Sequence, residues 1–359
     1  MKHKAFSILL LILLAVLAVV IYVRFIIPRL IQYPLINDIA SDYVGAQAML
    51  DPEAELYPIL GPAFARIGIN WPITHRSTHP PTTYLMVVPL ARLDYPVAQV
   101  IWMGAMFVCI VVSFWALGLS WGLSLVAGLV SLAWPPGIWS LGQLTPIWLV
   151  GLSLAYRHRE RPLLSGILIA VASLPKFMAA PALLYPLWRK KWHSLIGFAA
   201  VWVAALGLVL LLRGDAISAY ISSNMGNSME QIMRPDNGAL LVMAWRAAKW
   251  PGVVVVGALI LAVLWLGVQR ERFWGWGCLV WVGIALLPLA WTYSLFPLLP
   301  WLIKAVRSPD STIRLLAVVA LFLPYLGPIP AMNAVAITLS IIFSGVAIFL
   351  LSNRQGMFV

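Results

Sequence analysis

Residues 162–188 read PLLSGILIAVASLPKFMAAPALLYPLW, and this mostly apolar stretch lies between basic clusters at 157–161 and 189–191. Short loops rich in Lys and Arg usually lie on the cytoplasmic side of a membrane, so both ends of the stretch are expected on the same side. A single helix would place its ends on opposite sides. The sequence therefore predicts a hairpin of two short helices. We expect its turn at 174–177, because the residue before Pro175 disfavours continued helix.

The composition extends this prediction to the whole chain. Apolar residues make up 62% of the 359 residues and charged residues only 10%, which is far more apolar surface than a soluble protein of this size can bury. We therefore expect an all-α polytopic membrane protein. The net charge of +12 comes from basic residues that flank apolar runs, so it indicates topology rather than binding to nucleic acid.

The basic residues also give the apolar runs a topology. With the N-terminus and the basic clusters inside, 14 basic and 3 acidic residues lie on the cytoplasmic side, against 10 basic and 9 acidic residues outside. This asymmetry predicts that both termini are cytoplasmic. The first run resembles a signal peptide, but it is long and lacks a clear cleavage site, so we interpret it as an uncleaved span. About twelve spans fit, several of them short, at approximately 5–27, 97–118, 121–135, 144–156, 162–174, 177–188, 194–212, 252–268, 274–290, 293–303, 314–327 and 332–350.

Two long loops are predicted on the outside, at 28–96 and 213–251, and we treat the chain as a single transmembrane domain over residues 1–359. In the first loop, residues 38–50 place apolar side chains on one helical stripe, which predicts an interfacial helix lying flat on the membrane. A second helix is expected after the prolines at 80–81. The second loop carries enough polar side chains to bind a sugar or a phosphate.

The first loop also carries two acids four residues apart, Asp38 and Asp42. On a helix this spacing puts both carboxylates on one face. Like charge and partial desolvation raise the proton affinity of a carboxylate, so such a pair at a membrane surface can supply a general base. The alternatives are a solvated loop charge or an acid at a helix N-terminus. Lys176, at the predicted turn, is expected on the same outer side, either as a functional cation or as a lysine that extends its ammonium group to water.

Several motifs occur in a defined order along the chain. They are Asp38-Ile39-Ala40-Ser41-Asp42-Tyr43-Val44-Gly45-Ala46, Leu56-Tyr57, His79-Pro80-Pro81 running to Pro89-Leu90, Gly142-Gln143, Ser165-Gly166 leading to Pro175-Lys176 and Arg189-Lys190-Lys191, and Pro288-Leu289-Ala290-Trp291-Thr292-Tyr293. Together they resemble the polyprenol-phosphate-dependent glycosyltransferases of the GT-C fold, and most closely glycosyltransferase family 87, the bacterial α-mannosyltransferase family. The resemblance covers roughly residues 35–300.

The resemblance implies a GT-C-like membrane fold in the bacterial inner membrane, with the active site facing outside. It also implies transfer of a hexose, with mannose suggested by the family name, from a polyprenyl-phosphate sugar donor to a lipid or glycan acceptor by inverting displacement. This chemistry needs an acid and one or two cations, so no cofactor or metal is expected. The expected partners are the donor, the acceptor and membrane lipids. The alternative is a transporter or flippase of lipid-linked sugars, which predicts mid-span ionisable groups and an internal repeat that the sequence does not show.

The roles known in the family carry over to Asp38 as the catalytic base and to Lys176 as the group that faces the donor phosphate. Arg234 and His79 are candidate helpers at that phosphate. Asp42 is the second candidate for catalysis, and otherwise the neighbour that orients Asp38. The candidate substrate-binding residues are Tyr57, His75, Gln143, Trp291 and Tyr293.

Several of these residues have a plainer interpretation. The Gln143 side chain can form hydrogen bonds with backbone groups left unpaired where a helix is interrupted, and Trp291 can anchor the chain at the membrane interface. The two histidines of the first loop can be ordinary loop residues, and Arg234 can pair with Asp236 at the surface. Tyr293 stands where many members of the resembled family carry a histidine.

Overall fold

Helices form the regular structure throughout the described part of the chain. The computed structural model of the protein describes residues 38–71, 73–131, 142–269, 273–326 and 333–354, and the single positions Val16, Val20 and Val23. Within these residues, the one β-type pairing is an isolated antiparallel bridge between Ile59 and Arg76. The predicted all-α class is confirmed for this part of the chain.

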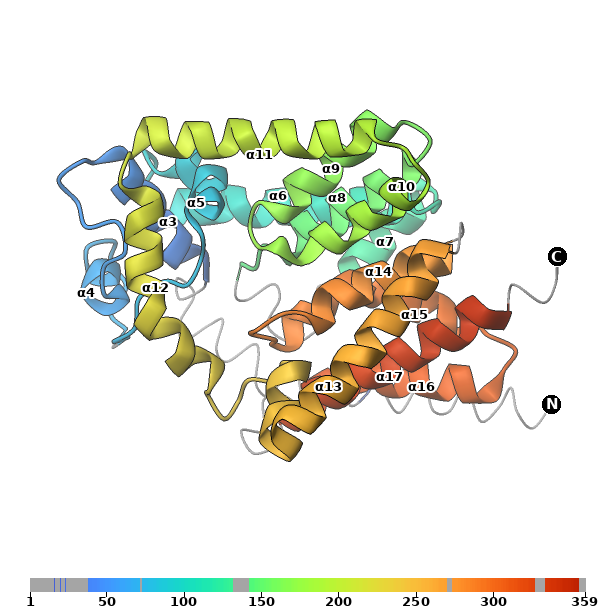
Figure 1. Ribbon diagram of the computed structural model, residues 1–359. Coiled ribbons are helices and arrows are strands. Elements are labelled where there is room, and N and C mark those ends of the chain that lie inside the picture. The colour runs from blue at the N-terminus through green and yellow to red at the C-terminus, as the bar shows by residue number, and fades with distance from the viewer. Residues whose placement is uncertain are drawn as a thin grey trace.

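The helices follow one another with mostly short connections (Figure 1). The predicted first span, 5–27, lies outside the described residues apart from the three valines. In chain order the elements are α3 (Asp38–Leu50), α4 (Leu60–Ala65), α5 (Pro81–Val87), η2 (Val88–Leu90), α6 (Tyr95–Ala116), α7 (Trp121–Ser131), α8 (Thr145–Arg157), α9 (Pro162–Ser173), η3 (Phe177–Leu183), α10 (Leu184–Trp188), α11 (His193–Leu212), α12 (Ala216–Ile232), α13 (Leu240–Gln269), α14 (Phe273–Ala285), η4 (Thr292–Leu298), α15 (Leu299–Val306), α16 (Ser311–Phe322), η5 (Leu323–Leu326) and α17 (Asn333–Arg354).

Four of these helices, α6, α11, α13 and α17, are long and apolar enough to cross a membrane. The other apolar helices of the described chain are shorter, as several of the predicted spans are. Short helices at membrane depth are tolerated where protein covers their ends. The structure therefore supports a helical, multi-pass membrane protein, and the count of twelve spans stays a prediction.

The predicted hairpin is present. The first arm, α9, ends at Ser173 and the second begins at Phe177, so the chain turns around Pro175 as expected. At the open end of the hairpin, Lys191 Nζ lies 2.6 Å from Glu160 Oε2, which brings the two basic clusters together. The turn and the basic clusters thus lie at opposite ends of the hairpin. Which membrane face each end occupies stays a prediction.

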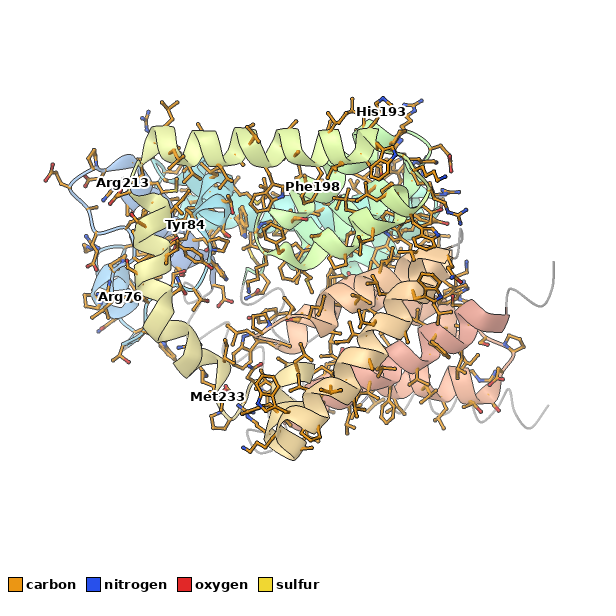
Figure 2. All side chains as sticks on the ribbon, viewed as in Figure 1. Arg76, Tyr84, His193, Phe198, Arg213 and Met233 are labelled. Atoms are coloured by element: carbon orange, nitrogen blue, oxygen red, sulfur yellow. The ribbon has the colours of Figure 1, made fainter. Side chains whose placement is uncertain are left out.

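Two hydrophobic cores organise the molecule. The first-loop core gathers α3, α4, α5 and the N-terminal half of α6, with the adjoining ends of α11 and α12. The bundle core gathers α8, α9, η3 and the helices from α13 to α17. One helix, α6, joins them, because Trp102 belongs to the first core and Ile110 to the second. A second helix, α11, runs along one edge of the molecule from His193 to Arg213 just past its end (Figure 2).

The structure corrects one expectation about the first loop. Residues 38–50 form a helix as predicted, but the buried side chains of α3 are not confined to one apolar stripe, and its placement relative to the membrane stays a prediction. Ala40 and Ala48 are as buried as the stripe residues Ile39 and Tyr43. The elements α4, α5, η2 and α6 all contact α3, so protein rather than lipid covers it.

The predicted second loop, 213–251, is largely helical. It contains α12 and the start of α13. In Figure 1, α12 runs from the end of α11 towards the start of α13, so it links the two cores. The ring of Tyr220 on α12 packs 5.8 Å from the ring of Tyr57 in the first-loop core, measured between centroids. The polar side chains of α12 interrupt any apolar stripe, which is why the sequence pattern does not predict this helix.

Candidate active site

The helix α3 carries both predicted acids. Asp38 is its first residue and Asp42 lies one turn further on, with a side chain that is 2% exposed. A close approach of α5 encloses this part of α3. Gly45 permits it, because a Cβ at this position would lie 2.5 Å from the ring of Tyr84 on α5. The two carboxylates are therefore held by a packed helix and not by a solvated loop.

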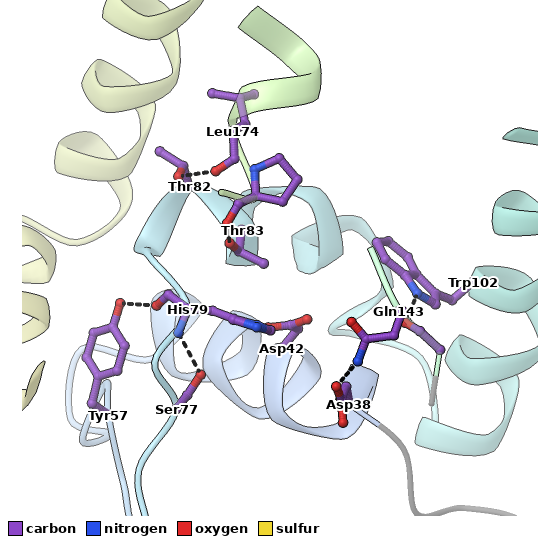
Figure 3. Close-up of polar contacts among 12 residues, drawn as sticks. Asp38, Asp42, Tyr57, Ser77, His79, Thr82, Thr83, Trp102, Gln143 and Leu174 are labelled. Carbon is purple, nitrogen blue, oxygen red and sulfur yellow. Dashed lines mark hydrogen bonds and ion pairs between the residues drawn. The ribbon is translucent and has the colours of Figure 1, made fainter. Parts of the chain in front are cut away.

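Asp42 pairs with a histidine from the segment that leads into α5. His79 Nδ1 lies 2.6 Å from Asp42 Oδ1 (Figure 3). The backbone of the histidine is fixed as well, because Tyr57 donates its hydroxyl hydrogen to the His79 carbonyl oxygen at 3.1 Å. The Ser77 hydroxyl accepts a hydrogen bond from the His79 amide at 3.3 Å. Asp42 thus orients His79, a contact that the sequence did not predict, and its candidacy as a second catalytic acid stays a prediction.

Asp38 has a different partner. The Gln143 side-chain amide donates a hydrogen bond to Asp38 Oδ2. Gln143 is buried and precedes α8, next to Gly142, whose carbonyl oxygen accepts a hydrogen bond from Trp102 Nε1 at 3.0 Å. Gln143 therefore belongs to the candidate site rather than only to a helix end.

Lys176 reaches the same place from the hairpin turn. The Thr82 hydroxyl of α5 donates to the Leu174 carbonyl oxygen at 2.6 Å, and the Thr83 hydroxyl donates to the Pro175 carbonyl oxygen at 2.9 Å (Figure 3). The turn is thereby held against the segment that carries the histidine. The Lys176 ammonium lies 5.9 Å from the centre of the Trp148 ring.

Hydrogen bonds bring the lysine-bearing turn towards the acid-bearing helix. His79 pairs with Asp42, and Thr83, four residues further along the chain, holds the Pro175 carbonyl oxygen next to Lys176. The same acids come from the first-loop core, and the lysine comes from the bundle core. A carboxylate and an ammonium in one partly desolvated space interact much more strongly than they would in bulk water.

The second candidate cation, Arg234, has its own partners. Arg234 forms a bidentate pair with Asp236, with Nε–Oδ1 and Nη2–Oδ2 distances of 3.0 and 2.8 Å. Its guanidinium carbon also lies 5.2 Å from the centre of the Trp291 ring. Tyr293 is buried in the bundle core. The predicted pairing of Arg234 with Asp236 is confirmed.

Two predicted substrate-binding residues have other contacts. Tyr57 is buried, and its hydroxyl is engaged by the His79 backbone, so its geometry favours positioning over contact with a substrate. His75 is half-buried beside the bridge between Ile59 and Arg76, where its Nδ1 lies 3.1 Å from the Arg76 carbonyl oxygen. Of the two histidines, His79 is the one paired with a predicted acid.

Asn237 supports the site, although it is not among the residues predicted from the sequence. Its side-chain amide donates to the carbonyl oxygens of Ile232 and Pro288, both at 2.9 Å. Its side-chain oxygen accepts from the amides of Ala239 and Ala290, both at 3.0 Å. All four hydrogen-bonding positions of this buried amide are used. Asn237 thus joins the chain after α12 to the segment before Trp291, and its place in a polar predicted loop gave no signal of this role.

Comparison with known proteins places this geometry in a family. A polyprenol-phosphate-mannose-dependent alpha-(1-2)-phosphatidylinositol pentamannoside mannosyltransferase from Mycolicibacterium smegmatis is 26% identical over 300 residues, which cover 76% of this chain and 70% of the relative. A protein of the same name from Mycobacterium tuberculosis is 25% identical over 305 residues, covering 76% of this chain and 68% of the relative. No solved structure matches the chain.

The family comparison covers the greater part of the molecule. The sequence model of glycosyltransferase family 87 matches residues 78–323. The match includes His79, the hairpin and the segment around Trp291, and it begins after the helix that carries the two acids. Because it spans more than half of the sequence, the chain belongs to glycosyltransferase family 87 and is a glycosyltransferase.

Proposed function

We propose that this glycosyltransferase transfers a mannosyl group from a polyprenyl-phosphate donor to a lipid or glycan acceptor outside the bacterial inner membrane. The shared name of the two relatives supports the donor and the sugar, and it suggests a phosphatidylinositol mannoside as the first acceptor to test. The whole chain acts as one transmembrane catalytic domain of GT-C type, with both termini in the cytoplasm.

The convergence of Asp38 with Lys176 carries this proposal. Transfer from a polyprenyl phosphate requires a base for the acceptor hydroxyl and a cation for the departing phosphate. An acid and a lysine from segments far apart in the sequence can supply these two groups. Their approach is supported by the His79–Asp42 pair and by the hydrogen bond from Thr83 to the residue before Lys176.

In the proposed reaction, the acceptor oxygen attacks the anomeric carbon while the bond between that carbon and the phosphate oxygen breaks. Asp38 takes the acceptor proton, and Gln143 orients its carboxylate through the observed hydrogen bond. The polyprenyl phosphate leaves with the bonding electron pair, and Lys176 stabilises its charge. This single displacement inverts the anomeric centre. His79 and Arg234 are placed to assist with the phosphate, and Trp291 and Tyr293 border the sugar.

The test is a transfer assay with the purified protein in lipid nanodiscs. Labelled polyprenyl-phosphate mannose is supplied with a phosphatidylinositol mannoside, and glucose, galactose and arabinose donors are run beside it. We expect transfer of mannose. Absence of transfer from every polyprenyl-phosphate donor would contradict the proposal.

Asp38→Asn tests the base directly. We expect kcat to fall at least about 100-fold, because the amide cannot take the acceptor proton. Asp94→Asn is the matched control, since Asp94 is an exposed aspartate of the same predicted loop, and it is expected to leave transfer unchanged. Full activity of Asp38→Asn would remove Asp38 from the mechanism.

A further inference from the structure

Two adjacent threonines join the two cores at the candidate site. Thr82 and Thr83 belong to the first turn of α5, and both side chains are fully buried. Their hydroxyls donate to the consecutive carbonyl oxygens of Leu174 and Pro175, at 2.6 and 2.9 Å. These contacts cross 92 residues of sequence and end at the residue before Lys176.

The two carbonyl groups have a physical need for these donors. The last carbonyls of a helix have no partner within it, and Leu174 and Pro175 follow the end of α9 directly. A buried carbonyl without a donor is costly. The threonine hydroxyls satisfy both groups from a neighbouring element, so the contact selects one position of the turn relative to α5.

The other side of the turn is also constrained. The Met178 amide donates to the Lys176 carbonyl oxygen at 2.7 Å, which closes the turn. On α14, a Cβ added to Gly283 would lie 2.0 Å from the Met178 carbonyl oxygen. The backbone around Lys176 is therefore held between α5 on one side and α14 on the other.

We propose that Thr82 and Thr83 are positioning residues that set the Lys176 ammonium against the Asp42–His79 pair. The chain from His79 to Thr82 contains only two residues, both prolines, whose ring-fixed φ angles make the connection stiff. A displacement of the hairpin turn from α5 therefore changes the separation between the lysine and the histidine. This inference rests on the proposed function, because it assigns the threonines to the cation that faces the donor phosphate.

Activity of threonine variants gives the first test. Thr82→Val and Thr83→Val keep the side-chain shape and remove the donors. The double variant is expected to lower kcat about ten- to a hundred-fold, since misplacement of a catalytic group by about 1 Å has effects of this size. Thr82→Ser and Thr83→Ser keep the donors and are expected to restore most of the rate.

A matched control removes a comparable hydrogen bond elsewhere. The buried Ser340 hydroxyl on α17 donates to the Ala320 carbonyl oxygen of α16 at 2.6 Å. Ser340→Ala is expected to leave kcat within about two-fold of the wild type. Its hydrogen bond lies outside the candidate site, and substitutions at well-separated positions act independently. Equal losses in this variant and in the threonine variants would overturn the proposal.

A double-mutant cycle separates positioning from general support. If the threonines act through Lys176, they have no further effect on kcat once the lysine is replaced by Lys176→Gln. We therefore expect the threonine double variant to be nearly as active in that background as Lys176→Gln alone. Fully additive losses would show that the threonines act independently of the lysine, and would overturn the proposal.

A measurement that does not depend on sugar transfer separates this inference from the proposed function. The two native cysteines are removed by Cys109→Ala and Cys278→Ala, and one cysteine is introduced by Lys176→Cys. Its rate of alkylation by a maleimide is then measured. The threonine double variant is expected to change this rate at least about five-fold, and Ser340→Ala to leave it unchanged. Gly283→Ala, which displaces the opposite side of the turn, is expected to change it as well. An unchanged alkylation rate in the threonine double variant would overturn the positioning role. If the wild-type protein fails to transfer the sugar, only the proposed function is contradicted.

Discussion

The two cores differ in size and in the contacts that stand out in each. In the bundle core, large aromatic side chains pack on small residues: Trp301 covers Gly277, and Trp281 covers Gly345. This is the packing expected of helices in a membrane, where close contact replaces the hydrophobic effect. The first-loop core has a smaller apolar interior, and a charged side chain donates several hydrogen bonds to its backbone carbonyls. The helix that holds the acids is thus fixed by directional contacts as well as by packing.

Arg213 is the clearest of these contacts. Its guanidinium donates to the carbonyl oxygens of Ala48, Asp51 and Ala54 at 2.8, 2.6 and 2.8 Å. Its Nε also lies 2.7 Å from Asp215 Oδ1. The side chain is 11% exposed, so these groups have little access to water. One arginine after α11 therefore fixes the C-terminal end of the helix that carries the acids.

Among the substitutions that test this difference, Arg213→Ala is expected to have the largest effect on stability. Three carbonyl groups would lose their charged donor, which is expected to lower the free energy of opening of the first-loop core by about 4 kcal/mol. Hydrogen exchange at residues 39–64 would measure the change. Arg314→Ala, on α16, is the control and is expected to have no effect there. Equal protection in both variants would show that the first-loop core does not depend on the arginine.

Asp42→Ala comes next. It leaves His79 without its buried partner, and we expect a loss of about 3 kcal/mol in the stability of the first-loop core. Asp38→Asn is expected to change stability by less than about 1 kcal/mol, because this acid stands at the helix N-terminus. Thermal unfolding of the two variants in the same detergent would compare them. A reversed order would mean that Asp38, and not Asp42, is the structural acid.

A pair of glycine variants is expected to affect the cores separately. Gly277→Ala would place a Cβ 2.4 Å from the Trp301 ring, and Gly45→Ala would place one 2.5 Å from the Tyr84 ring. Each is expected to destabilise its own core by about 2 kcal/mol through overpacking. Gly104→Ala, which has open space around it on α6, is the control and should be neutral or slightly stabilising. Hydrogen exchange that changes in both cores for either variant would contradict two separate cores.

The smallest effect on stability is expected at the end of the hairpin that carries the basic clusters. Lys191 holds the pKa of Glu160 below its ordinary value through a hydrogen bond and its positive charge. The stabilisation is therefore present above the ordinary glutamate pKa and is lost as the pH falls through the lowered value. Because this pair is exposed, Glu160→Gln should change the stability at pH 7 by less than about 0.5 kcal/mol. A larger change in thermal unfolding would show that polar contacts also hold the bundle.

The sequence predicts the bundle better than the first-loop region. Apolar length and the residue before Pro175 were enough to place α9 and the hairpin turn, since both signals are local. The basic clusters also predicted that Lys176 lies on the same side of the membrane as the two acids. It did not find that Asp42 pairs with His79, because 37 residues separate them and neither has a local pattern that indicates the other.

The missed features share a cause. α12 has no apolar stripe, and Asn237, Arg213 and Thr82 act on backbone carbonyls far away in the sequence. Such contacts depend on tertiary structure, and a single sequence gives no spacing rule for them. The single buried stripe predicted for 38–50 failed for the same reason, because neighbouring elements also bury residues such as Ala40 and Ala48.

The length of α11 has a consequence for the depth of catalysis. The helix has 20 residues, which at about 1.5 Å per residue gives roughly 30 Å, the thickness of the hydrocarbon layer. It starts just after the basic cluster at 189–191 and ends at the arginine that holds α3, so its length fixes the separation between the basic end of the hairpin and the first-loop core. Removing one residue would turn Arg213 by about 100° away from its carbonyl partners. Under the proposed function, the residue count of α11 therefore sets how far the transfer site lies from the basic end of the hairpin, although α11 contributes no reacting group.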